Sequence, residues 1–96
     1  MAKPLRYRRR PGLDTRLVDG EAFVITRSTI QHLNLTATLV WLVLEIPSPQ
    51  ALVVDVLQDA YRQVPRRQLS LDAGRMLRQL RQMGLASANR DAESPS

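Results

Sequence analysis

The chain has 96 residues, of which 44% are hydrophobic and only 4% aromatic, so it has room for one small core of aliphatic side chains. It contains no cysteine, which excludes disulfides, thiolate metal sites and cysteine nucleophiles and favours a cytoplasmic location. The formal net charge of +5 indicates an anionic partner, which would be an acidic peptide, a nucleic acid or an acidic protein surface.

Residues 1–12 are rich in arginine and also contain proline and glycine, which predicts a basic, flexible tail. No apolar segment follows that would make this stretch a secretory signal. The longest apolar run, residues 37–44, is far shorter than the roughly 20 residues that span a bilayer. We therefore expect neither export nor a membrane partner.

Two stretches with alternating apolar residues, loosely in residues 13–18 and more clearly in residues 21–26, are predicted to form a β-hairpin. The Asp19-Gly20 pair between them tolerates the positive φ angles of a tight type I′ turn. A third, shorter strand is expected over residues 30–33, after a polar break that contains no glycine or asparagine. These segments predict a three-stranded antiparallel meander.

Helices are predicted for the rest of the folded region. The first is capped by Asn34, and its inward stripe follows the spacing of an amphipathic helix: Ala37, Val40, Trp41 and Leu44. The second is expected to have Ser48 as N-cap and Pro49 at its first helical position, where a missing N–H costs nothing. It should end near Tyr61.

The third helix begins at Pro65 in the preferred interpretation, because its apolar stripe starts before Ser70, the alternative cap of a shorter helix. Gly84 is expected to end it in a left-handed conformation. Residues 87–96 are small, polar and unpatterned, which predicts a disordered tail. The folded unit would then span residues 13–86 as an α+β domain, with a three-stranded sheet followed by three helices.

No residue pattern in the sequence is typical of an active site. His32 is the only histidine, and we expect no cysteine, nucleophile or carboxylate near it, which argues against a triad or a histidine metal site. The acidic residues are scattered, and no glycine-rich phosphate loop joins a strand to a helix. The sequence therefore predicts no catalytic residue, metal or cofactor.

Two features favour recognition of a partner. One is the strand over residues 30–33, which would lie at a sheet edge. The other is a flank of the third helix: at about 100° per residue, four side chains fall together beside the inward stripe, namely Asp72, Met76, Gln79 and Met83. Methionine adapts to partners of different shape; the alternative is that both methionines only complete the core.

Several short motifs follow one another in order: Gly20-Glu21 at the hairpin, Leu33-Asn34, Thr36-Ala37 and Trp41 at the first helix, and Asp72, Leu77, Leu80, Gly84 and Leu85 near the end. With them, residues 13–86 resemble the PqqD-like family, also called RiPP recognition elements, which bind ribosomally made peptides. Two turns depart from the family pattern, since the turn before the third strand lacks a glycine and residues 45–48 replace an acidic-glycine turn.

The resemblance implies a winged-helix-like domain that acts as a non-catalytic adaptor. Such a protein holds the leader of a precursor peptide as an added strand and presents it to a modifying enzyme, either a radical SAM maturase or, in lasso-peptide pathways, a leader peptidase. Carried onto this chain, the resemblance predicts two sets of contact residues: Ile30, Gln31, His32 and Leu33 on the strand, and Asp72, Met76, Gln79 and Met83 on the helix. Arg75 and Arg78 would attract acidic leader residues.

Two other functions are alternatives. A winged-helix DNA-binding regulator would use the basic tail together with Arg75, Arg78 and Arg81. Steps of about 100° spread these arginines around the helix rather than along one groove-reading face, which argues against nucleic acid. The other alternative is a structural subunit that only stabilises an enzyme.

Overall fold

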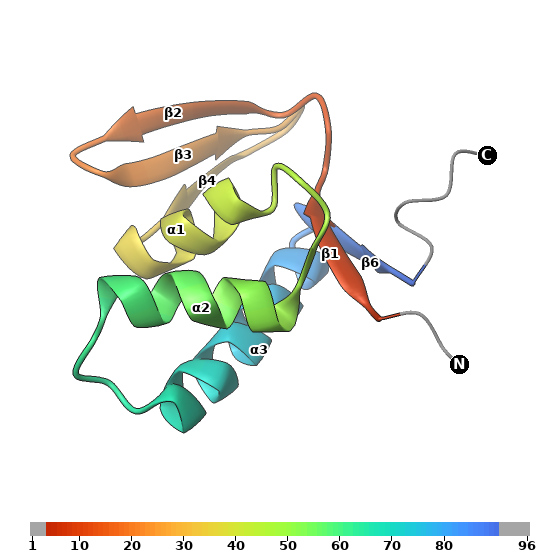
Figure 1. Cartoon of the computed structure of the whole chain (residues 1–96). Helices are drawn as coiled ribbons and strands as arrows, with labels where there is room; N and C mark the ends of the chain where they lie inside the picture. The colour runs from red at the N-terminus through yellow and green to blue at the C-terminus, as the bar shows by residue number, and fades with distance from the viewer. Residues whose placement is uncertain (1–3, 91–96) are drawn as a thin grey trace.

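The computed structural model describes residues 4–90, which contain six strands and three helices (Figure 1). Four strands come first, and a fifth strand separates the first helix from the other two, which a last strand follows. The strands β2 (Asp14–Val18), β3 (Glu21–Ile25) and β4 (Ile30–Leu33) form an antiparallel sheet in the order β2-β3-β4. This sheet is the predicted meander, and the α+β class is confirmed.

Different side-chain chemistry shapes the two turns of the meander. Asp19 and Gly20 have φ angles of 52° and 80°, so the β2–β3 turn has the positive φ values that its sequence predicts. At the β3–β4 turn, the hydroxyl of Thr26 accepts hydrogen bonds from the backbone N–H groups of Ser28 (3.3 Å) and Thr29 (3.0 Å). A threonine side chain therefore organises the turn that lacks a glycine.

The helices α1 (Leu35–Val43), α2 (Gln50–Ala60) and α3 (Arg66–Gln82) lie close to their predicted positions. Asn34 caps α1, because its side-chain oxygen accepts a hydrogen bond of 2.9 Å from the N–H of Ala37. Pro65 immediately precedes α3, which supports the longer of the two predicted helices.

The predicted start of the second helix is wrong by one residue. Pro49 is the N-cap of α2, and the first helical residue is Gln50. Ser48 is buried, and its hydroxyl donates to the carbonyl of Ile46 at 2.7 Å rather than capping the helix. A buried hydroxyl needs a hydrogen-bond partner, and the nearby carbonyl supplies it before the helix begins.

Gly84 ends α3 in the left-handed conformation, with a φ of 75°. The N–H of Gly84 then bonds to the carbonyl of Arg81 at 3.0 Å, and the N–H of Leu85 bonds to that of Leu80 at 2.9 Å. This pair of bonds is a Schellman motif, which returns the chain sharply and buries Leu85 beside Leu80 in the core.

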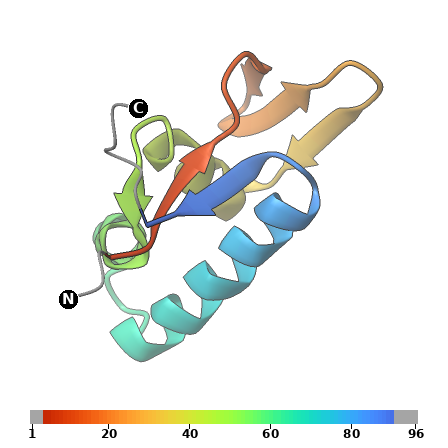
Figure 2. The same cartoon turned by 90° about the vertical axis from the view of Figure 1, so that its right-hand side faces the viewer.

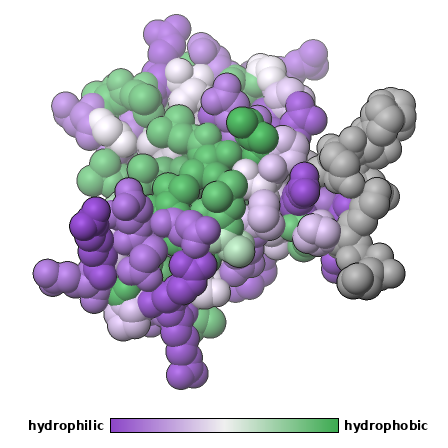
Figure 3. Space-filling view, in the orientation of Figure 1, coloured by the Kyte–Doolittle hydropathy of each residue, from purple (hydrophilic) through white to green (hydrophobic). Residues whose placement is uncertain are grey.

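The core lies between the meander and the three helices. Trp41 of α1 is fully buried, and its indole N–H donates to the hydroxyl of Thr15 on β2 at 3.1 Å. The remaining core is mainly aliphatic, as the composition predicts. A domain of this size cannot cover every apolar side chain: Figure 3 shows an apolar area over α1 and α2, whose exposed large residues are Leu35, Leu42 and Leu52.

A second sheet joins three segments that are far apart in the sequence, in the order β5-β1-β6. They are β1 (Arg6–Arg9), β5 (Ser48–Pro49) and β6 (Ala86–Asn89). The predicted flexible tail over residues 1–12 is thus wrong for β1, and the predicted disordered tail over residues 87–96 is wrong for the part within β6. Residues 1–3 and 91–96 of these tails lie outside the described residues.

Contacts with the core explain why the basic segment forms a strand. Tyr7 packs against the core, and the guanidinium of Arg9 lies 5.2 Å from the centre of the Trp41 ring. The backbone N–H of Arg9 bonds to the carbonyl of Leu44 at 2.9 Å, and that of Arg10 bonds to the carbonyl of Leu85 at 2.7 Å. Local composition does not reveal these contacts, because every partner is distant in sequence.

Candidate peptide-binding site

The strand β4 lies at an edge of its sheet. Its four residues pair with β3, from Ile30 opposite Ile25 to Leu33 opposite Ala22. Within residues 4–90, no strand pairs with the other side of β4. An edge strand exposes a row of backbone N–H and C=O groups to which an extended peptide can bind.

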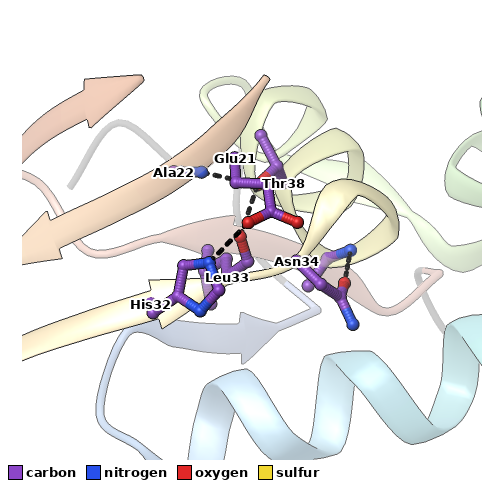
Figure 4. A network of polar contacts seen from close by, with 7 residues as sticks. Glu21, Ala22, His32, Leu33, Asn34 and Thr38 are labelled. Carbon is purple, nitrogen blue, oxygen red and sulfur yellow. Dashed lines mark hydrogen bonds and ion pairs between the residues drawn. The ribbon is translucent and has the colours of Figure 1, made fainter. Parts of the chain in front are cut away.

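The hydrogen bonds of β4 show which residues face this open edge. The carbonyl of Thr29 accepts from the N–H of Thr26 on the β3 side (2.9 Å). At the other end, the Thr38 hydroxyl donates to the carbonyl of Leu33 (3.1 Å) and accepts from the N–H of Ala22 (2.8 Å), so it bridges β4 to β3 (Figure 4).

Backbone groups alternate in direction along a strand. The backbone N–H and C=O groups of residues 29 and 33 point toward β3, so those of residue 31 also point toward β3. The N–H and C=O groups of Ile30 and His32 therefore face the open edge. Leu33, by contrast, is only 4% exposed and belongs to the core, so its side chain is not available to a bound peptide.

The side chain of His32 is held on the outer face of the sheet. Its Nε2 atom lies 2.7 Å from a carboxylate oxygen of Glu21, and its ring stacks on Phe23 with centroids 4.8 Å apart. The expectation of no carboxylate near His32 is therefore wrong, because strand pairing brings Glu21 across from β3. The described residues contain no group of three or more side chains suited to hold a metal ion.

The four predicted residues of α3 differ in their surroundings. Asp72 accepts a hydrogen bond from Gln68 (3.0 Å) and pairs with Arg75 (3.7 Å). Met76 packs against the core, whereas Gln79 is exposed and Met83 is 39% exposed. The helix lies below β4 in both ribbon views (Figures 1 and 2).

An open hollow of roughly 740 Å³ lies where β4 begins and α3 ends. It brings together Gln31 of β4 and Met83, the C-cap of α3, one residue from each predicted set. The other six predicted residues do not line it. The remaining lining comes from the start of β2 and the segment before it, from the β3–β4 turn and from the turn after α3: Arg10, Pro11, Gly12, Leu13, Asp14, Ile25, Thr26, Arg27, Ser28, Thr29 and Gly84.

Most of these lining residues are not among the predicted contact residues. The polar break at residues 27–29, next to the predicted edge strand, was a signal for part of the hollow. No sequence pattern indicates that Arg10 and Leu13 line a hollow, because Arg10 lies in the predicted tail and Leu13 is the first residue of the predicted folded unit.

The charges around the hollow also differ from the prediction. Arg10 donates to the carbonyl of Gly84 at 3.5 Å, and Arg27 has no carboxylate partner among the residues described. Arg75 is paired with Asp72, and Arg78 lines a separate hollow beside β6. The arginines at this hollow are therefore Arg10 and Arg27 rather than the predicted Arg75 and Arg78.

Comparison with known proteins identifies the fold. The family model of coenzyme PQQ synthesis protein D (PqqD) matches residues 17–86. The fold is similar to that of TbiB1 in the structure of TbiB1 in complex with the TbiA(beta) leader peptide, with a TM-score of 0.74 and 21% sequence identity over 83% of this chain and 94% of that chain. None of the curated proteins matches the chain. Across residues 4–90, no helix is both long and apolar enough to cross a membrane.

Proposed function

Since the chain belongs to the PqqD family, we propose that it is a non-catalytic adaptor that binds the leader of a ribosomally synthesised precursor peptide and presents it to a modifying enzyme. The observation that carries this proposal is the open edge of β4, which lies beside the end of α3. The solved TbiB1 structure, which contains a leader peptide, supports it.

In this proposal the leader adds to the sheet as an extended strand next to β4. Its backbone hydrogen-bonds to Ile30 and His32, whose N–H and C=O groups face the open edge. Its side chains alternate between the outer face of the sheet and the hollow lined by Gln31 and Met83. Backbone bonds supply affinity that depends little on sequence, while the hollow selects among leader side chains.

The charge and flexibility of the lining indicate which leaders would fit. Met83 is a flexible apolar side chain, which suits leucine, isoleucine or an aromatic residue of varied shape. Arg10 and Arg27 at the same hollow favour acidic leader residues and would accelerate the encounter of the two chains. We therefore propose a leader in which apolar positions alternate with polar ones and an acidic residue flanks them.

The modifying enzyme is proposed to be a radical SAM maturase or a leader peptidase, with the adaptor acting in the cytoplasm. Membership of the PqqD family supports the non-catalytic role. DNA binding has less support, because Arg75 is neutralised by Asp72 and the other two arginines face β6.

Fluorescence anisotropy of a labelled leader tests whether the leader binds and whether its backbone pairs with β4. We expect saturable binding to the full chain. Methylation of single leader N–H groups should weaken binding at every second position of the bound segment, by about tenfold at each, because only alternate residues of an added strand face β4. The methylated positions between them serve as controls.

Two results would contradict the proposal, the first by excluding strand addition at β4 and the second by excluding the adaptor function. One is uniform sensitivity to methylation along the leader, which an added strand cannot produce. The other is the absence of leader binding together with binding to duplex DNA that falls steeply with salt.

A further inference from the structure

The second sheet has an open edge of its own. The strand β6 pairs with β1 through Ala86 opposite Arg9 and Ser87 opposite Arg8, and no strand in the described part of the chain pairs with its other side. It follows α3 through the Schellman turn and runs back above the C-terminal half of that helix (Figure 2). This edge is therefore a second candidate for strand addition.

A hollow of roughly 560 Å³ lies between this strand and the helix. Its lining comes from three residues of β6 with small side chains and from three long polar residues of α3: Ala86, Ser87, Ala88, Arg78, Arg81 and Gln82. The small side chains leave space above the strand, so the hollow can receive side chains of a peptide that pairs with β6.

The charged side chains that line this hollow are both arginines. Arg78 and Arg81 have no carboxylate partner among the described residues, whereas Arg66 and Arg75 on the same helix pair with Asp55 and Asp72. Two guanidinium groups that line one hollow and have no carboxylate partner within residues 4–90 favour a ligand that brings carboxylates.

The two flanks of α3 thus lie next to different edge strands, one next to β4 and the other next to β6. At about 100° per residue, Arg78 and Arg81 fall on one side of the buried stripe formed by Leu77 and Leu80, while Met83 falls on the other side. Met83 lines the hollow at β4, and the two arginines line the hollow at β6. A peptide at one edge therefore leaves the other edge accessible.

We propose that β6 is a second strand-accepting site, which binds an extended acidic segment of the modifying enzyme. The inference rests on the proposed adaptor function, because an adaptor has to hold the leader and the enzyme at the same time. The enzyme segment would pair with the backbone of residues 86–88 and direct carboxylates at alternate positions toward Arg78 and Arg81.

Nuclear magnetic resonance on the ¹⁵N-labelled full chain tests this site, with an end-capped peptide of alternating glutamate and valine as the probe. We expect the largest amide shifts at Ala86, Ser87 and Ala88, and unchanged amides at Ile30 and His32. The double variant Arg78→Glu/Arg81→Glu should weaken binding of the probe by about tenfold, since it replaces two attractions with repulsions.

A matched double variant, Arg62→Glu/Arg67→Glu, makes the same change of net charge on exposed residues outside this hollow and should bind the probe normally. The inference is overturned if both double variants bind the probe equally, if the shifts occur at β4, or if valine-to-proline replacement in the probe leaves its affinity unchanged. Displacement of the probe by duplex DNA would also overturn it, because the site would then prefer phosphate.

Leader binding measured on the same samples separates the two proposals. A leader that still binds while the probe fails at β6 overturns only the second site. A leader that does not bind overturns the adaptor function itself, whatever the probe does.

Discussion

His32 combines an available backbone with a constrained side chain. Its N–H and C=O groups face the open edge, while its ring is held between Phe23 and the carboxylate of Glu21 on the neighbouring strand. Fixing the ring limits the conformations of β4 before a peptide arrives. Less conformational entropy is then lost on binding, which increases affinity.

Replacing His32 by proline removes the N–H that faces the open edge without removing a backbone hydrogen bond to β3, although the ring contacts with Glu21 and Phe23 are lost as well. We expect His32→Pro to stay folded, because edge strands tolerate proline where the N–H faces solvent, but to lose about tenfold in leader affinity. Anisotropy measures the affinity, and thermal unfolding followed by circular dichroism measures the stability.

Two neighbouring variants control for other effects of this change. His32→Ala keeps the N–H and should retain most of the affinity. Gln31→Pro removes a bond to β3 and should lower the melting temperature. Equal leader affinity in His32→Pro and His32→Ala would show that this N–H does not bind the leader.

At the scale of elements, α3 supports both proposed sites by presenting a different flank to each edge strand. Its core stripe fixes the rotation of the helix, since Leu77 and Leu80 are buried. With that rotation fixed, Met83 faces the hollow at β4, and Arg78 faces the hollow at β6. The amphipathic pattern therefore determines which side of the helix is buried and also which side chains line each hollow.

Met83→Asp tests the apolar flank more cleanly than Met76→Asp, because Met76 also packs against the core. A carboxylate at residue 83 would be desolvated by an apolar leader side chain, so we expect leader affinity to fall by about tenfold. The unfavourable charge near the end of the helix should cost about 0.5 kcal/mol of stability. Titration calorimetry with the leader measures the first effect.

Leu71→Asp is the matched control for this substitution. Leu71 is 61% exposed on the same helix and does not line the hollow at β4, so its variant should bind the leader normally. If Met83→Asp binds the leader as tightly as Leu71→Asp, the leader does not contact the end of α3.

At the scale of the whole molecule, the second sheet ties both ends of the folded chain to the α1–α2 connection. Its central strand β1 contributes Tyr7 to the core and places the guanidinium of Arg9 over Trp41. Small domains bury little surface, so one additional side chain in the core is a substantial fraction of their stability. We therefore expect β1 to stabilise the whole domain.

Two substitutions in β1 measure this contribution. Tyr7→Ala removes a partly buried aromatic ring and should lower the free energy of unfolding by about 1.5 kcal/mol, whereas Arg8→Ala on the exposed side of the strand should change it by less than about 0.5 kcal/mol. Urea denaturation gives both values. Equal effects of the two substitutions would indicate that residues 6–9 do not pack on the core in solution.

The sequence alone determined the features that arise from interactions between near neighbours. The Asp19-Gly20 turn, the Asn34 cap and the left-handed Gly84 each depend on a few adjacent residues. The three-residue and four-residue spacing of apolar side chains likewise located all three helices. The resemblance to the PqqD-like family, confirmed over residues 17–86, rests on the same ordered motifs.

Only the tertiary structure decided which distant segments meet. The strands β1, β5 and β6 form a sheet although each is short and two of them read as parts of tails. The hollow at β4 draws its lining from three separate segments within residues 10–14, 25–31 and 83–84, and its arginines are not those expected from the helix pattern. Contacts of this kind leave no local period in the sequence, because each residue's partner becomes its neighbour only after the core has formed.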